Sequence, residues 1–97
     1  VDYDDKAVAK WLKADGGKAI LEELRAGLSA MERFEKEPVE ILLKSVAERR
    51  GLKLGKVAQP LRVAVTGGDA SPPMHETLSI LGKETVMARI DRTLKTL

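Results

Sequence analysis

The chain has 97 residues, of which 17 are basic and 15 acidic, so its length suits one hydrophobic core and its charge is nearly balanced. It contains no cysteine, which excludes disulfides and thiolate zinc sites, and no run of about 18 apolar residues, which excludes a membrane-spanning helix. We therefore expect a monomeric, cytoplasmic domain without membrane contact, and the start at Val1 instead of methionine suggests a fragment of a longer protein.

The first helix is expected from Asp4 onward, because acidic residues favour a helix N-terminus. Val8, Trp11 and Leu12 then recur on one face at helical spacing. The two glycines at residues 16–17 should end this helix.

Two more helices are predicted before the middle of the chain. An apolar stripe at helical spacing predicts one over residues 18–31: Ile20, Leu21, Leu24, Leu28 and Met31. After a charged turn at residues 32–37, Pro38 fits the first turn of a third helix. Gly51 is a common type of stop signal and should end it.

A fourth helix is expected over residues 54–66. Its inward face repeats at helical spacing: Leu54, Val57, Ala58, Leu61 and Val65. Gln59 and Arg62 lie on the opposite face. Pro60 lacks an amide hydrogen, so it should either kink this helix or begin a second one.

Gly67-Gly68 should end the fourth helix, and Pro72 then suits the first position of a helix that reaches Leu81, with Asp69 and Ser71 as candidate caps. A last helix is expected over residues 83–96. No strand pattern competes. The sequence thus predicts an all-α bundle of five or six short helices, in which residues 1–50 and 51–97 form two parts of one compact unit.

Catalytic chemistry has little support in these residues. His75 is the one histidine, and it has neither a cysteine nor an evident triad beside it. Adjacent carboxylates such as Glu22-Glu23 fit a solvated helix surface, and the glycine pair lacks the Lys-Ser/Thr of a phosphate-binding loop. We expect no catalytic residue, no cofactor and no metal in this chain.

Binding of RNA has more support. Residues 51–97 carry 7 basic and 4 acidic side chains, whereas residues 1–50 carry 10 and 11, so the second half is the positive one. Arg62 offers a planar set of donors, and Ser71 offers a hydroxyl beside the amides of a helix start. From these residues alone, a surface ion pair for Arg62 and a simple cap for Ser71 remain open.

A family resemblance covers nearly half of the chain, from Gly51 to Leu94. Its motifs are Gln59-Pro60-Leu61-Arg62 with Ala64, Thr66 and Gly67, then Ser71-Pro72, and then Leu81-Gly82-Lys83-Glu84. In these motifs and their spacing the chain resembles the C-terminal anticodon-binding domain of bacterial glutamyl-tRNA synthetases. The preceding segment, from Tyr3-Asp4-Asp5-Lys6-Ala7 onward, is similar to that family's preceding helices in order and length.

The resemblance implies the all-helical anticodon-binding fold of class I aminoacyl-tRNA synthetases and a surface that recognises the anticodon of glutamate tRNA. Matched one at a time, the residues implied at this surface are Arg62, Gln59, Ser71, Pro72, Met74 and His75. The chain departs from the family pattern at Pro73, Met74 and His75, which leaves their contacts less defined. Arg89 and Arg92 are candidate contacts to the RNA backbone.

The resemblance also implies the partners. The parent enzyme would attach glutamate to its tRNA with ATP and Mg²⁺, but the ATP-site signatures of the family do not occur in these residues. We therefore expect this chain to bind tRNA without catalysis, next to the catalytic domain of the same parent chain. Two other functions stay open: a helix-turn-helix DNA-binding module, although DNA is not the expected partner, and a helical domain that docks a protein.

Overall fold

The computed structural model describes residues 3–13, 16–68 and 73–97, and every regular element in these ranges is helical. The elements are α1 (Asp5–Val8), which continues as a π-helical turn η1 (Ala9–Lys13), α2 (Gly17–Ser29), α3 (Lys36–Arg50), α4 (Leu54–Thr66), α5 (Met74–Leu81) and α6 (Lys83–Thr96). The prediction of an all-α fold is confirmed. None of these helices has the length and apolar character that crossing a membrane requires.

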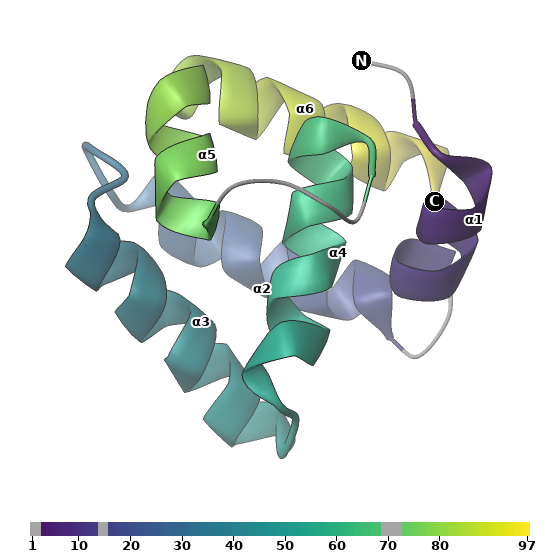
Figure 1. The fold of residues 1–97 in the computed structure, drawn as a ribbon, viewed down its shortest axis with the longest axis horizontal. Helices are drawn as coiled ribbons and strands as arrows, with labels where there is room; N and C mark the ends of the chain where they lie inside the picture. Colours follow the sequence, from purple (N-terminus) through teal and green to yellow (C-terminus); the bar gives the residue numbers. More distant parts are fainter. Residues whose placement is uncertain (1–2, 14–15, 69–72) are drawn as a thin grey trace.

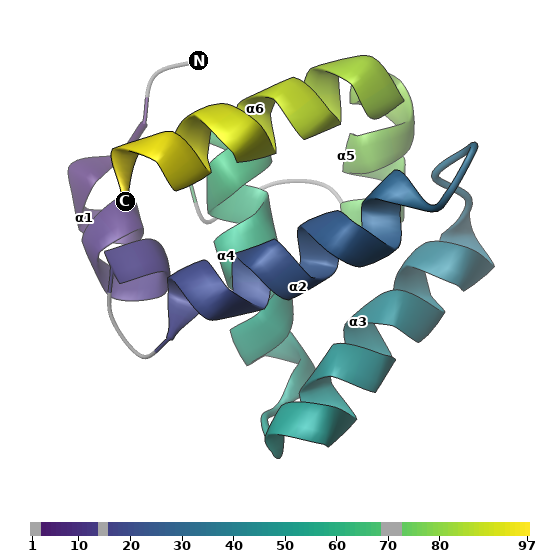
Figure 2. The same ribbon diagram turned by 180° about the vertical axis from the view of Figure 1, so that it is seen from behind.

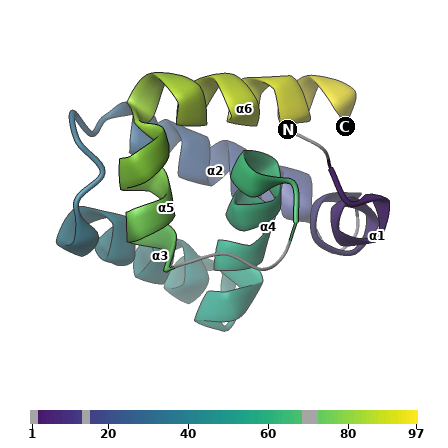
Figure 3. The same ribbon diagram turned by 45° about the horizontal axis from the view of Figure 1, so that its top comes forward.

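Helix α4 is the centre of the arrangement and packs against every other helix (Figure 1). Seen from behind, α2 crosses α4 and α6 runs above α2 (Figure 2). The tilted view places α6 along one edge, with α5 and α4 beneath it (Figure 3). Each of the other described helices therefore contacts the central helix directly.

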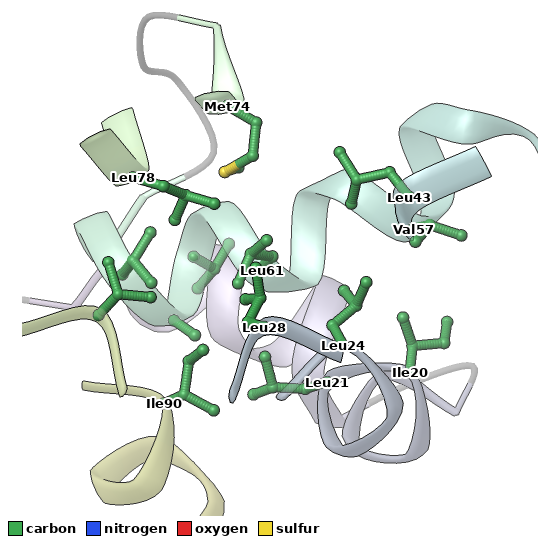
Figure 4. Close-up of a cluster of buried hydrophobic side chains, with 14 of the residues drawn as sticks. Ile20, Leu21, Leu24, Leu28, Leu43, Val57, Leu61, Met74, Leu78 and Ile90 are labelled. Carbon is green, nitrogen blue, oxygen red and sulfur yellow. The ribbon is translucent and has the colours of Figure 1, made fainter. Parts of the chain in front are cut away.

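The core is one cluster that takes residues from both halves of the chain. Leu61 of α4 and Leu28 of α2 lie near its middle, and Ile90 of α6 belongs to the same cluster (Figure 4). All three side chains are fully buried. The predicted division near residue 50 consequently does not separate two cores.

The predicted glycine stops have the expected geometry. Gly51 takes a left-handed conformation with φ 64°, and the Leu52 amide donates to the Ala47 carbonyl at 2.9 Å. This is the hydrogen bond of a Schellman motif. Gly67, with φ 87°, ends α4 in a similar way, because its amide donates to the Val63 carbonyl at 2.8 Å.

Pro60 leaves α4 a single helix, so the alternative in which it begins a second helix is excluded. The physical reason lies in the flanking residues. Val57 before it and Leu61 after it are both fully buried in the same cluster, which holds the two turns in line.

The prediction for the start of α5 is wrong by two residues. The helix begins at Met74, with Pro73 as its N-cap, and not at Pro72. Pro73 has φ −47° and ψ 144°, which lies outside the helical region, so the helix begins only after it. Asp69, Ser71 and Pro72 lie outside the described residues, so their capping roles stay predictions. The predicted ranges 54–66 and 83–96 agree with α4 and α6, whereas the range 18–31 differs from α2 by one residue at its start and two at its end.

Candidate nucleic-acid interface

A hollow of about 400 Å³ lies between α3 and α4, and the start of α5 borders one end of it. We call it the α3–α4 groove. Its lining residues are Lys36, Val39, Glu40, Leu43, Leu54, Ala58, Arg62, Pro73, Met74 and His75. Its volume falls in the range of roughly 300–1,000 Å³ that is usual for small-molecule pockets.

Helical periodicity explains why these residues meet. Helix α4 contributes Leu54, Ala58 and Arg62, which are spaced four residues apart and so lie in one row. Helix α3 contributes a matching row from Lys36 to Leu43. Because the two helices pack against each other, the two rows form facing walls.

The walls are apolar and the polar groups are few. Leu54 and Ala58 give accessible hydrocarbon surface, with the buried side chains of Val39 and Leu43 behind it. Arg62 and Glu40 add polar groups and are each half-buried. Apolar walls suit the faces of an unstacked nucleobase, and a few convergent donors and acceptors suit its edge or a phosphate. The groove therefore has the chemistry of a base-binding site.

The structure brings together three of the residues predicted for the interface. Arg62, Met74 and His75 all line the α3–α4 groove, although they come from different helices. Ser71 and Pro72 lie outside the described residues. Because Arg62 and the start of α5 share one hollow, a single ligand can contact both.

Met74 was expected at the surface, and this expectation is wrong. Its side chain is only 6% exposed and points into the hydrophobic cluster, toward Leu78 (Figure 4). The apolar face of α5 begins at its first residue, since Met74 and Leu78 are one helical turn apart. Met74 thus supports the inner wall of the groove instead of standing at its rim.

Gln59 lies one turn before Arg62 on α4 but does not line the groove. Its side-chain Oε1 is buried and has no hydrogen-bond partner among the described residues. An unpaired buried acceptor costs about 1–3 kcal/mol. Nothing in the described contacts explains why this oxygen is left unpaired. The contact of Gln59 with RNA stays a prediction.

Four carbonyls around the C-terminal end of α4 accept further hydrogen bonds, one from Thr66 of the same helix and three from distant parts of the chain. The Thr66 hydroxyl donates to the Arg62 carbonyl at 2.6 Å, and the Tyr3 hydroxyl donates to the Ala64 carbonyl at 2.8 Å. Arg89 Nη1 donates to the Val65 carbonyl at 2.6 Å, and the Asp4 amide donates to the Gly67 carbonyl at 2.7 Å. Helix ends leave such carbonyls without intrahelical partners. These bonds fix the end of α4, and with it the turn that follows Arg62 in the chain.

Two of these donors were missed by sequence reasoning. Tyr3 and Ala64 are 61 positions apart and Arg89 and Val65 are 24 apart, so no local pattern could reveal either pair. Arg89 was predicted as a backbone contact for RNA, but its half-buried guanidinium caps α4 and does not line the groove. Arg89 thus has a structural role, and its contact with the RNA backbone stays a prediction.

Arg92 is exposed and lines a different hollow, next to Asp5 and Lys13. This second hollow shares no lining residue with the α3–α4 groove. Trp11 lines a third hollow of about 340 Å³. The ammonium groups of Lys10 and Lys56 lie over its ring, at 4.8 and 5.8 Å from the ring centroid. The protein's own cations thus occupy the aromatic surface on which a base would stack.

Other site types fit the described residues poorly. No group of three histidine, cysteine, aspartate or glutamate side chains in the described ranges could hold a metal ion. As a DNA-recognition helix, α5 would expose Glu76, Ser79 and Ile80, none of which is basic. Recognition in the major groove normally uses arginine, asparagine or glutamine.

Comparison with known proteins adds three findings. Residues 1–94 match the family model described as an anticodon binding domain. A glutamate–tRNA ligase from Anaeromyxobacter sp. (strain Fw109-5) is 50% identical over 98% of this chain, and one from Syntrophobacter fumaroxidans is 40% identical over 98%. A crystal structure of a glutamate tRNA ligase from Elizabethkingia meningosepticum, in complex with its amino acid, matches 99% of this chain with a TM-score of 0.87 and 29% identity.

The matched regions are a small part of those proteins. They cover 20% of each of the two ligase sequences and 19% of the chain in the crystal structure. The present chain thus spans about a fifth of the length of the relatives that it matches.

Proposed function

Because this chain belongs to the anticodon binding domain family, we propose that it binds the anticodon loop of a glutamate-accepting tRNA as one part of a glutamate–tRNA ligase. The observation that carries this proposal is the α3–α4 groove, where Arg62 and His75 border apolar walls. Sequence-specific RNA recognition mostly targets single-stranded loops, whose unstacked bases can enter such a groove.

Each part of the groove has a task in this proposal. Arg62 donates to a base edge or a phosphate through its planar guanidinium, which has five N–H donors and can serve several acceptors at once. His75, at the start of α5, stacks on a base or donates to it. Ser71 and Pro72 precede this helix start, and we propose that they, together with Gln59, contribute further contacts to the loop.

The chemistry of the parent enzyme belongs elsewhere in its chain. We propose that the whole enzyme attaches glutamate to its tRNA with ATP and Mg²⁺, in the part that these residues do not span. The present domain contributes recognition and not catalysis. Its partners are then the tRNA and the catalytic domain of the same monomeric protein, and its compartment is the cytoplasm, where translation takes place.

Arg62 provides the test. We expect Arg62→Ala to weaken binding of an RNA stem-loop with the glutamate anticodon by about 10-fold or more, since hydrogen bonds to charged groups contribute roughly 1.5–3 kcal/mol. Arg62→Lys should weaken it as well, because lysine keeps the charge but loses the planar donors. Fluorescence anisotropy with a labelled stem-loop at low salt measures these affinities.

Arg33→Ala is the matched control, since Arg33 is exposed, does not line the groove and lies in the loop between α2 and α3. It removes the same charge and should change the affinity much less. Equal losses for Arg33→Ala and Arg62→Ala would reject the groove as the site. Equal binding of a stem-loop with an unrelated anticodon would reject anticodon recognition itself.

A further inference from the structure

Trp11, the single tryptophan of the chain, lines a hollow of about 340 Å³ that we call the Trp11 hollow. The residues that line it are Lys10, Trp11, Gly17, Ile20, Leu52, Lys56 and Pro60. It shares none of them with the α3–α4 groove. The Trp11 hollow is therefore separate from the surface proposed above for the anticodon loop.

The polar side chains of the Trp11 hollow are all hydrogen-bond donors. Lysine has three N–H donors and no acceptor, and the indole of tryptophan has one donor and no acceptor. The remaining lining residues are glycine, proline and aliphatic residues, so no carboxylate of the described residues lines the hollow. A ligand that matches this lining must bring acceptor atoms and negative charge.

The two lysines of the hollow have no partner of opposite charge. Lys10 lies on the π-helical turn η1 and Lys56 in the first turn of α4, yet their ammonium groups lie 4.8 and 5.8 Å from the centroid of the same indole ring. The ion pairs among the described residues involve neither of them. Like charges that gather at one ring repel each other, and an anion beside them would be attracted to both.

The backbone around the hollow favours an anion as well. Gly17 is the first residue of α2 and Lys56 lies in the first turn of α4, and neither helix has a side-chain cap or an acidic residue in that turn. The amides of a helix N-terminus carry partial positive charge. The indole Nε1 of Trp11 is buried and has no hydrogen-bond partner among the described residues. Two ammonium groups, two helix ends and an unsatisfied donor thus meet at one hollow.

We propose that the Trp11 hollow binds a phosphate group, with Lys10 and Lys56 as its charged contacts. The oxygens of a phosphate accept hydrogen bonds, and lysine is a common phosphate ligand that acts as a point charge. A nucleobase suits the hollow less well, because the two lysines cover the ring on which it would stack. The source that we expect is a backbone phosphate of the bound RNA, and this choice of source rests on the function proposed above. Free phosphate offers the same chemistry.

The fluorescence of Trp11 provides the test, because the single tryptophan reports on the hollow directly. The probes are inorganic phosphate and the RNA stem-loop with the glutamate anticodon, and sodium acetate at equal ionic strength is the reference anion. The variants are Lys10→Met and Lys56→Met, which keep an apolar stem of similar length. Lys44→Met is the matched control, since Lys44 is exposed on α3 and does not line the hollow.

We expect inorganic phosphate to change the Trp11 emission along a saturable curve that acetate does not reproduce. Lys10→Met and Lys56→Met should each weaken phosphate binding by about 2-fold to 5-fold, the range of exposed ion pairs, whereas Lys44→Met should leave it unchanged.

With the stem-loop, each of these two variants should lower the slope of log affinity against log salt by about 0.7–0.9, because one phosphate contact is lost. The loss should be the same for an unrelated anticodon, since backbone phosphates carry no sequence information.

Three results would overturn the inference: no saturable response to phosphate, an equal response to acetate, or a phosphate response that survives in both lysine variants. A lysine-dependent response to phosphate without any change of the salt slope would support the site and identify free phosphate as its ligand. Failure of the proposed function gives a different pattern, in which Arg62→Ala leaves the affinity for the stem-loop unchanged.

Discussion

Gly17, the first residue of α2, lies against the backbone of the preceding π-helical turn. A Cβ atom at this position would stand 1.9 Å from the Trp11 carbonyl oxygen and 2.8 Å from the Leu12 Cα. Both are backbone atoms, so they cannot move aside by changing a rotamer. The close approach of the first helix to α2 therefore requires a residue without a side chain.

We expect Gly17→Ala to lower the free energy of unfolding by about 1–3 kcal/mol or more, because the added methyl group forces the backbone apart. Gly55→Ala is the matched control, since Gly55 is exposed in α4 and a Cβ there would meet no atom within 4 Å. It should raise the free energy of unfolding by about 0.4–1 kcal/mol. Urea unfolding followed by circular dichroism measures both, and shifts of the same sign would contradict this account.

Single residues differ in how far the sequence could place them. Arg62 was predicted on a face opposite to the buried row of its helix, and a face needs only the helical period. The burial of Met74 depends on which helices surround α5, and the contact at Gly17 depends on the path of the chain at Trp11. Neither of these is encoded within a few residues of the position concerned.

The last carbonyls of helix α4 accept hydrogen bonds from residues near both termini of the chain. Tyr3 donates to the Ala64 carbonyl and Arg89 of α6 donates to that of Val65. The Thr93 hydroxyl lies 3.2 Å from the Tyr3 hydroxyl, which links these two donors through α6. The end of the helix that carries Arg62 is thus held by the first residues and the last helix together.

We expect Arg89→Met to lower the free energy of unfolding by roughly 1–3 kcal/mol, because the Val65 carbonyl loses a charged donor while the methionine keeps most of the apolar stem. Arg92→Met removes an equal charge three residues later from an exposed position and should change stability by less than about 0.5 kcal/mol. Thermal unfolding of the two variants at equal salt measures the difference. Equal midpoints would show that the capping bond contributes nothing.

Helices could be predicted from the sequence because their signals are local. Glycines 51 and 67 end helices where expected, since glycine adopts the left-handed conformation of a helix end without steric cost. The effect of Pro60 could not be decided, because the missing hydrogen bond permits a kink or a break and packing on both sides chooses between them. Caps such as Arg89 are equally hidden from local patterns.

At the scale of the whole molecule, the groove needs two helices that the sequence does not relate. The residues predicted for the site all lie beyond position 58, whereas one wall of the groove comes from α3, between Lys36 and Leu43. That wall holds Glu40, which sequence reasoning did not single out. A residue on a charged helix surface becomes a site residue only when another helix packs beside it.

The ion pair between Arg25 of α2 and Asp91 of α6 joins two residues that are 66 positions apart in sequence. Its side chains are 40% and 44% exposed, so solvent weakens the attraction. The hydrogen bond from Arg25 lowers the pKa of Asp91 below its ordinary value of 3.8, against the opposing effect of desolvation. The folded protein therefore binds a proton at Asp91 less readily than the unfolded chain does.

A lowered pKa in the folded state stabilises the protein above the ordinary value, and this stabilisation is lost as the pH falls through the folded pKa. We expect Asp91→Asn to lower the midpoint of thermal unfolding at pH 7, and the difference from the unchanged protein to shrink at a pH below the folded-state pKa of Asp91, where this carboxyl is protonated in both states. Glu22→Gln, at an exposed carboxylate of α2 without an ion pair among the described residues, should show no such convergence. A gap for Asp91→Asn that is equally wide at both pH values would mean that packing, and not the ion pair, sets the contribution of Asp91 to the contact between α2 and α6.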